Sequence, residues 1–227
     1  MARPALQPLR IAGPVGELEA EWLPPTRLPL TAAVVCHPLP TAGGSMHNKV
    51  VHTISRVFTS GGMGVLRFNT RGAGTSEGIF DHGDGEIDDL ASVVAHLRKQ
   101  GVERLWLAGF SFGSFLAFSL VARHPELIQH IDQLVLVAPP VARFDYTTTT
   151  LLPFPVTLLQ GDADEVTEPL AVYDWAEHIG MWIPHFDLLR FPDCDHFFHG
   201  RLIDLRHRLV DQLALHHPDL FGDRAGQ

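Results

Sequence analysis

The chain has 227 residues, of which 45% are hydrophobic and 19% are charged, a composition typical of a globular domain with a sizeable core. Its 26 Asp and Glu residues outnumber its 17 Lys and Arg residues, which gives a formal net charge of −9. This charge argues against binding of nucleic acid or of an anionic membrane surface, and no stretch approaches the roughly 20 apolar residues of a membrane span.

Apolar runs and amphipathic segments alternate along the chain. In chain order, strands are expected at residues 16–23, 32–36, 64–68, 104–108, 133–138, 156–160 and 186–191, and helices at 49–59, 86–100, 116–123, 169–179 and 202–216. This alternation predicts an α/β fold with a mostly parallel central sheet of about eight strands and helices on both faces. We expect a single domain over residues 1–227, with its core at about 30–217 and a frayed tail at 218–227.

A glycine-rich turn joins the strand expected at 104–108 to the helix that follows it. Residues 109–113 read GFSFG and match the G-x-S-x-G pattern, in which a strained strand-to-helix turn exposes a serine hydroxyl. The helix that starts here directs free N–H groups and its positive dipole end at the turn. Ser111 is therefore a candidate nucleophile, which would need a neighbouring base and an acid that orients the base.

Two later strands end in groups that fit these roles. Residues 161–166 read GDADEV and residues 192–196 read PDCDH. The carboxyl ends of parallel strands meet at one edge of a sheet, so these groups are expected to lie near Ser111. The residues alone leave the acid open among Asp162, Asp164 and Glu165. The base is open between His196, which comes first after the strand end, and His199.

With these motifs in this order, the chain resembles the α/β-hydrolase superfamily. It is most similar to its small, cap-less bacterial members, near the dienelactone-hydrolase-like esterases. The matching pieces, which span about residues 30–200, are 37–40 (HPLP) with 43–44 (GG), 71–78 (RGAGTSEG), 109–113 (GFSFG), 161–166 (GDADEV) and 195–198 (DHFF). The resemblance implies an α/β-hydrolase fold and a triad of Ser111, Asp164 and His196.

Acyl transfer also needs two N–H donors for the developing oxyanion. One is expected to be the amide of Phe112, directly after the nucleophile. The resemblance places the other on Leu39, the third residue of a motif in which Pro38 replaces the more frequent glycine. Because prolines lack an N–H group, Thr41 is the alternative donor in this loop.

Other motifs are interpreted as structural. Residues 71–76 lack the Gly-Lys-Ser/Thr ending of a phosphate-binding loop, and the acidic residues over 81–89 complement a helix N-terminus. No Cys/His set has the spacing of a zinc site. The connection 138–155 is too short for a lid, so we expect an open, shallow pocket lined by the side chains of Leu39, Phe110, Phe112 and Phe197.

The sequence thus predicts a serine hydrolase, most simply a carboxylesterase that acts on small, accessible, uncharged or weakly polar esters through an acyl-enzyme. The alternatives are a thioesterase, peptidase or perhydrolase with the same triad, or a non-catalytic ligand-binding module. No cofactor or metal is expected, the expected partner is a small ester or acyl substrate, and a monomer is the default. Two cysteines, Cys36 and Cys194, are too few for a disulfide framework and predict a cytoplasmic location.

Overall fold

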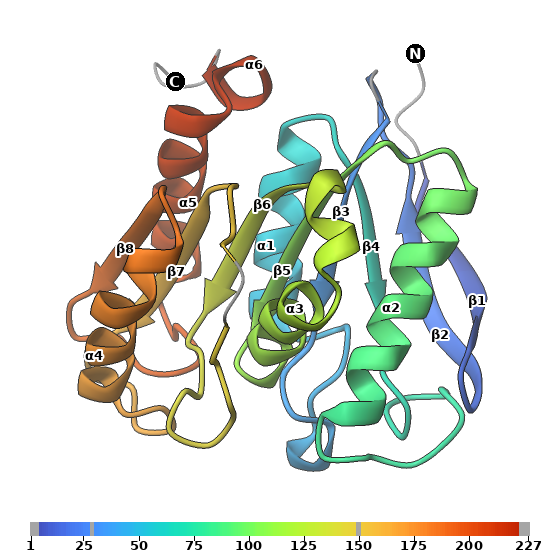
Figure 1. Ribbon diagram of the computed structural model, residues 1–227, viewed down its shortest axis with the longest axis horizontal. Helices are drawn as coiled ribbons and strands as arrows, with labels where there is room; N and C mark the ends of the chain where they lie inside the picture. The colour runs from blue at the N-terminus through green and yellow to red at the C-terminus, as the bar shows by residue number, and fades with distance from the viewer. Residues whose placement is uncertain (1–4, 28–29, 149–150, 223–227) are drawn as a thin grey trace.

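An eight-stranded sheet forms the centre of the molecule (Figure 1). The computed structural model describes residues 5–27, 30–148 and 151–222. The strands are β1 (Gln7–Gly13), β2 (Gly16–Leu23), β3 (Thr31–Cys36), β4 (Gly64–Phe68), β5 (Arg104–Phe110), β6 (Ile131–Val137), β7 (Val156–Gly161) and β8 (Phe186–Phe191). Their order is β1-β2-β4-β3-β5-β6-β7-β8. β1 and β2 are antiparallel to their neighbours and the rest are parallel.

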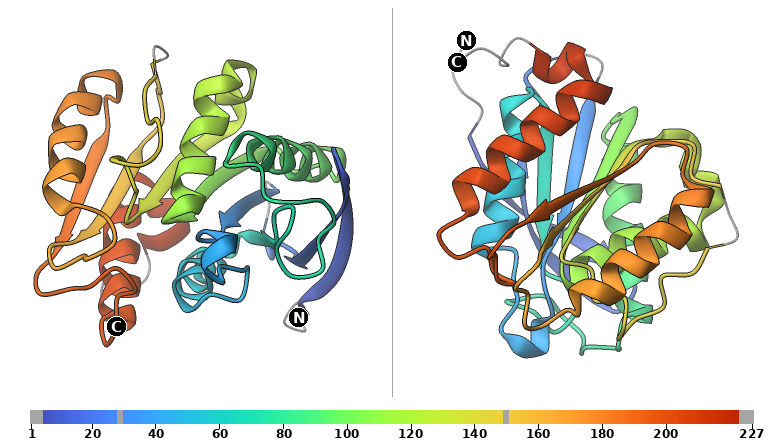
Figure 2. Two further views of the ribbon diagram at one scale, coloured as in Figure 1. Left: turned by 90° about the horizontal axis from the view of Figure 1, so that it is seen from below. Right: turned by 90° about the vertical axis from the view of Figure 1, so that its left-hand side faces the viewer.

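Helices cover both faces of this sheet (Figure 2). They are α1 (Lys49–Ser60), α2 (Asp84–Lys99), α3 (Phe112–Arg123), α4 (Pro169–Ile179), α5 (Leu202–His216) and α6 (Pro218–Phe221). α2, α3 and α4 contribute to the hydrophobic core on one face, and α1, α5 and α6 to the core on the other. The prediction of a mostly parallel sheet with helices on both faces is confirmed.

The continuous apolar strands follow from burial on both faces. In the paired strands β3 and β5, Val34 opposes Leu107 and Val35 opposes Ala108. Successive side chains of a strand point to opposite faces. Accordingly, Val34 and Leu107 lie in the core under α2 and α3, while Val35 and Ala108 lie in the core under α1 and α5.

Both ends of the chain differ from the prediction. β1 was not expected; it pairs with β2 and buries Ile11, so the core begins before residue 30. At the other end, Pro218–Phe221 forms α6 rather than a frayed tail. Phe221 is 1% exposed and its ring lies 6.0 Å from that of Trp106. Residues 223–227 lie outside the described residues.

The loop after β4 has the structural role expected for it. The Arg71 guanidinium donates to both carboxylate oxygens of the buried Asp89, and the Arg71 amide also donates to Asp89 (2.8 Å). Glu86 accepts hydrogen bonds from the amides of Asp81 and Gly83 at the start of α2. These contacts tie the loop to α2 and pair the charge of Arg71 with that of Asp89.

The connection between β6 and β7 forms no lid. Among its described residues, 138–148 and 151–155, the chain forms turns and extended segments with no helix. The carboxyl ends of the parallel strands lie on the lower side of the sheet in Figure 1. Within the part of the chain that the structure describes, no helix is long and apolar enough to cross a bilayer.

Candidate active site

Ser111 lies on a tight turn between β5 and α3, at the carboxyl edge of the sheet. Its φ of 53° is in a region that non-glycine residues rarely adopt. Close approach of backbones explains the two flanking glycines. A Cβ at Gly109 would lie 2.0 Å from the carbonyl oxygen of Gly113, and a Cβ at Gly113 would lie 2.3 Å from that of Cys36. Residues 109–113 thus form the turn that the G-x-S-x-G pattern predicts.

The structure brings Ser111, His196 and Asp164 together from three loops. The Ser111 hydroxyl lies 3.1 Å from Nε2 of His196, and Nδ1 of His196 lies 2.8 Å from Oδ2 of Asp164. With Nδ1 protonated, the imidazole donates to Asp164 and presents its free Nε2 to the serine proton. Ser111 is 8% exposed and His196 is 2% exposed. The arrangement is that of a nucleophile, a base and an orienting acid.

Asp164 is held by donors on both of its oxygens. Oδ1 accepts from the amides of Val166 (2.8 Å) and Thr167 (2.7 Å), and Oδ2 accepts from the Thr167 hydroxyl (2.6 Å) and Nε2 of Gln160 (3.1 Å). Burial opposes ionisation, but the hydrogen bonds from His196 and Thr167 outweigh it and lower the pKa of Asp164. The carboxylate therefore stays ionised beside the imidazole.

The rival residues have other partners. Oδ1 of Asp162 accepts from the amide of Asp193 (2.6 Å), which braces two neighbouring loops, and Glu165 is exposed. Nδ1 of His199 bonds Asp195 (2.7 Å) on the surface. Neither rival carboxylate nor His199 contacts the Ser111 hydroxyl or the His196 ring, so the geometry favours Asp164 and His196.

The two residues predicted to supply oxyanion donors, Leu39 and Phe112, both line the pocket that contains Ser111. Phe112 is the first residue of α3, so its N–H has no intrahelical acceptor. Leu39 lines the same pocket. Thr41 is exposed, belongs to the 3-10 turn Pro40–Ala42 and does not line this pocket. The geometry therefore favours Leu39 over Thr41 as the second donor.

His37 anchors the loop that carries Leu39. Its Nδ1 donates to the carbonyl of Pro38 (2.6 Å), and its Nε2 accepts from the amide of Thr70 (3.1 Å) in the loop after β4. Burial lowers the pKa of His37 to about 4. The neutral ring can therefore keep one donor and one acceptor in place, and it links the two loops through a fixed tautomer.

A small pocket of about 170 Å³ opens beside Ser111. Its walls are mostly apolar, and they include Leu39, Phe112, Pro140, Arg143, Phe144, Val166 and Phe197. Phe197 is 41% exposed at this pocket, as predicted. Arg143 and Phe144 were not predicted, because nothing in the pattern of the 138–155 connection indicates which of its side chains turn toward the serine.

The assignment of Phe110 to the pocket is wrong. Phe110 is the last residue of β5 and is fully buried in the core shared with α1 and α5. Its ring centroid lies 5.0 Å from that of His196 and 6.2 Å from that of Phe197. Phe110 therefore supports the His196 ring from the protein interior instead of meeting a substrate.

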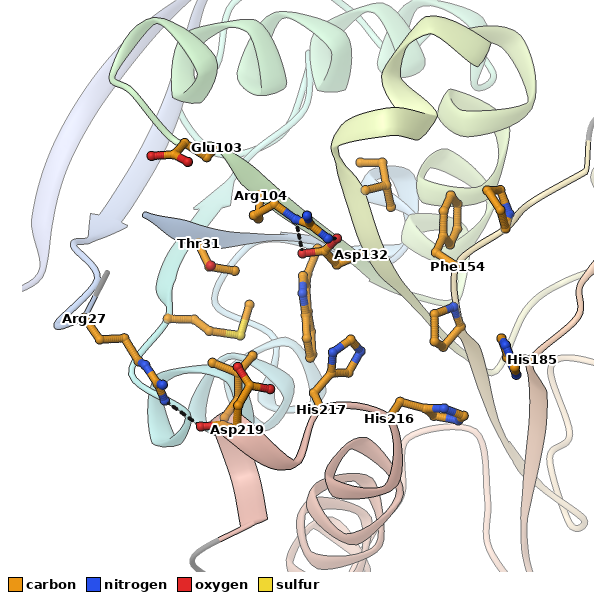
Figure 3. Close-up of a pocket in the computed structure, with 16 residues that line it drawn as sticks. Arg27, Thr31, Glu103, Arg104, Asp132, Phe154, His185, His216, His217 and Asp219 are labelled. Atoms are coloured by element: carbon orange, nitrogen blue, oxygen red, sulfur yellow. Dashed lines mark hydrogen bonds and ion pairs between the residues drawn. The ribbon is translucent and has the colours of Figure 1, made fainter. Parts of the chain in front are cut away.

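A second, larger cavity of about 770 Å³ lies at the opposite end of the sheet (Figure 3). Its lining residues come from the beginnings of β5, β6 and β7 and from the junction between α5 and α6. Arg104 is paired with Asp132, and Arg27 donates to the carbonyl of Asp219 (2.9 Å). The lining of this cavity thus carries charges of both signs and does not include Ser111. Among the described residues, no group of three or more His, Cys, Asp or Glu could hold a metal ion.

Comparisons with known proteins agree with this geometry. Residues 32–152 match a family model described as serine aminopeptidase, S33. The chain is 30% identical over 226 residues to the uncharacterized protein RP471 of Rickettsia prowazekii, covering 94% of this chain and 93% of that protein. It is 43% identical to XC6422 of Xanthomonas campestris, a serine hydrolase without a lid, with a TM-score of 0.80 over 91% of this chain and 92% of that one. It is 36% identical to an α/β serine hydrolase homologue of Coxiella burnetii, with a TM-score of 0.82 over 92% and 97% of the two chains. The sheet order, the nucleophile turn and these matches together assign the chain to the α/β-hydrolase superfamily of serine hydrolases, as a member without a lid.

Proposed function

We propose that this serine hydrolase is a carboxylesterase that acts on small esters through a triad of Ser111, His196 and Asp164. The observation that supports this most directly is the 3.1 Å contact between the Ser111 hydroxyl and Nε2 of His196, at the wall of a small, mostly apolar pocket. A pocket of about 170 Å³ fits a short acyl or alcohol group better than a long chain. The absence of a lid helix among the described residues leaves that pocket open to solvent.

The proposed reaction has two halves. The Ser111 oxygen attacks the ester carbonyl while Nε2 of His196 takes its proton, and the amides of Leu39 and Phe112 donate to the oxyanion. Collapse breaks the bond to the alcohol oxygen, which receives the proton from His196 and leaves. A water, deprotonated by His196, then attacks the acyl-enzyme and releases the acid. The steps use only groups of the chain and one water, so no cofactor is required.

The pocket supports ester cleavage over aminopeptidase activity. An aminopeptidase must hold the positively charged α-amino group of its substrate, which calls for a carboxylate. Among the described residues that line the pocket, none is Asp or Glu. A thioesterase or perhydrolase would use the same triad, so turnover of an ester, a thioester and an amide with the same acyl group distinguishes these activities.

Labelling with a fluorophosphonate probe tests the proposal. We expect one adduct, located on Ser111 by peptide mapping, because only a serine with a neighbouring base is activated. Ser111→Ala should remove the adduct and ester turnover. Ser92→Ala is the matched control, because Ser92 is half-buried on α2, does not line the pocket, and its hydroxyl bonds its own helix (3.0 Å to the carbonyl of Asp88). A folded wild-type protein that binds ester ligands but forms no adduct would favour the ligand-binding module instead.

The cellular setting is part of the proposal. Cys36 and Cys194 are free and buried, and neither is cross-linked, as a reducing compartment allows. We therefore propose a cytoplasmic enzyme that acts as a monomer on a small-molecule ester, with no nucleic-acid or membrane partner.

A further inference from the structure

Arg143 stands out among the residues that line the pocket beside Ser111. Within the described residues of that lining it is the one permanently charged side chain. His196 is the other ionisable group there, and both of its ring nitrogens are engaged by Ser111 and Asp164. An exposed cation in the mostly apolar wall of the pocket that contains Ser111 is positioned to meet part of the substrate.

The loop that carries Arg143 is anchored to the nucleophile turn. The amide of Arg143 donates to the carbonyl of Pro140 (3.0 Å). Three residues on, the hydroxyl of the buried Tyr146 bonds the Ser114 hydroxyl (2.7 Å), which itself donates to the carbonyl of Ser111 (2.6 Å). Because this chain of hydrogen bonds is buried, Arg143 emerges from a backbone held in a set position relative to Ser111.

Arg143 has no acidic partner among the residues that the structure describes. None of the ion pairs within residues 5–27, 30–148 and 151–222 includes it. The carboxylate nearest in sequence, Asp145, accepts from the amide of Thr147 (2.9 Å). The guanidinium therefore keeps its donors for solvent or for a ligand. Its planar fork matches a carboxylate, which can accept two parallel hydrogen bonds from it.

We propose that Arg143 binds a carboxylate on the substrate, so that the preferred substrates are small esters carrying a free carboxylate on their acyl or alcohol part. This inference rests on the proposed esterase function and replaces the expectation of uncharged esters. Hydrolysis itself is unchanged, since Arg143 acts on binding and orientation only. The formal net charge of −9 gives no general attraction for anions, so the preference must come from this residue.

The test uses two pairs of nearly isosteric substrates. On the acyl side, 4-nitrophenyl hemiglutarate is compared with its methyl-capped diester. On the alcohol side, the butyrate ester of 4-hydroxybenzoate is compared with that of 4-hydroxybenzamide. Each anionic member differs from its partner mainly in charge. The pair that shows the larger preference for the anion identifies the side on which Arg143 binds.

Three variants carry the argument. Arg143→Gln should lower kcat/KM for the preferred anionic ester by about tenfold or more, mainly through KM, because a charge-assisted hydrogen bond is lost. Arg143→Lys keeps the charge but not the fork and should recover part of the loss. The neutral esters should change by less than about twofold, a free-energy difference below the size of one net hydrogen bond. Arg123→Gln removes the same charge at the far end of α3, roughly 16 Å along the helix axis from Phe112. This control should leave kcat/KM unchanged for both the anionic and the neutral esters.

The outcomes separate this inference from the esterase proposal. If the wild type cleaves both members of each pair equally and Arg143→Gln changes both alike, the inference is refuted and the esterase proposal stands. If no ester is cleaved and Ser111 forms no fluorophosphonate adduct, the esterase proposal fails and the inference fails with it. Loss of the anionic preference at 0.5 M NaCl in the wild type is a further expected result, since salt screens an exposed charge pair.

Discussion

Replacing Asp164 with asparagine should nearly abolish turnover, because every partner of this carboxylate is a hydrogen-bond donor. In one orientation, the amide NH2 of Asp164→Asn would donate to Nδ1 of His196. That bond forces the ring proton onto Nε2, the nitrogen that must accept the proton of Ser111. In the other orientation, the NH2 would face the backbone N–H groups of Val166 and Thr167, which now donate to Oδ1 at 2.8 and 2.7 Å.

The size of the effect follows from the tautomer. The imidazole can act as base only in the fraction of molecules with Nε2 unprotonated, and a wrongly oriented or wrongly protonated base in a Ser-His-Asp triad lowers kcat by about 10⁴. That loss corresponds to about 5.5 kcal/mol of transition-state free energy. We therefore expect kcat/KM for a short-chain 4-nitrophenyl ester to fall by about 10³ to 10⁴ in Asp164→Asn.

The assay compares Asp164→Asn with Asp162→Asn. Asp162 is two residues away and needs only one acceptor oxygen, for the amide of Asp193, which asparagine also provides. This control should keep at least about a third of wild-type kcat/KM, since it preserves the hydrogen bond. Retention of more than a tenth of wild-type activity by Asp164→Asn, or an equal loss in Asp162→Asn, would refute the assignment of the acid.

The same variant has a signature in stability against pH. Because the pKa of Asp164 is lowered in the folded state, its ionised form stabilises the fold above the unfolded-state pKa of about 3.9. That contribution is lost as the pH falls through the folded-state pKa. The Tm difference between wild type and Asp164→Asn should therefore be fully present at pH 7 and should shrink below about pH 4. A difference that is constant from pH 7 to pH 3 would contradict the lowered pKa.

Three further predictions concern groups away from the reacting atoms. Burial, with a repulsive contribution from His216, lowers the pKa of His217 to about 4. Between about pH 6.5 and pH 4 the unfolded chain therefore binds more protons than the folded protein. As the pH is lowered across that range, the Tm of the wild type should fall more steeply than the Tm of His217→Gln. Phe221→Ala should lower the stability by about 3 kcal/mol or more, measured by urea unfolding, because its buried ring packs on Trp106; no change would mean that α6 is not docked. Burial raises the pKa of both thiols, that of Cys194 to about 11, so iodoacetamide at pH 7.5 should leave native ester turnover intact, and rapid inactivation would contradict their burial.

The edge of the sheet that carries the candidate site could be predicted without knowing the strand order. All parallel strands end at the same edge, whichever strands are neighbours. Ser111, Asp164 and His196 each follow an apolar run, and all three strands end on the same side. The strand order itself was not predicted, since the apolar run of a strand does not indicate which other strands lie beside it. The α3 start at Phe112 was also missed, because Gly113 and Ser114 have low helix propensity and tertiary packing overrides it.

The errors have equally local causes. β1 contains Pro8 and Arg10 and buries mainly Ile11, so it has little apolar signal of its own and exists through its ladder with β2. Phe110 was assigned to the pocket because it adjoins the serine. The strand continues through it, however, and in a strand successive side chains alternate faces, which directs Phe110 into the core. A single-residue shift in where a strand ends reverses such an assignment.

Other parts of the site had no sequence signal. Gln160 and Thr167 hold Asp164 through contacts that depend on the fold of the loop after β7. Tyr146 reaches Ser114 across 32 residues. Polar residues at such positions are common in loops and strand ends, and only the tertiary arrangement distinguishes the ones that hold the triad from those that meet solvent.

The backbone at Ser111 has a consequence for how this position would evolve. A non-glycine residue at a φ of 53° raises the free energy of the folded state by about 1–3 kcal/mol relative to an unstrained residue. Glycine adopts this conformation without strain and would make the turn more stable, but it has no hydroxyl. Selection for stability alone would therefore remove the serine, while selection for turnover retains it. Stability and activity therefore favour different residues at position 111. A relative with glycine at this position would be one that has kept the fold and lost the reaction.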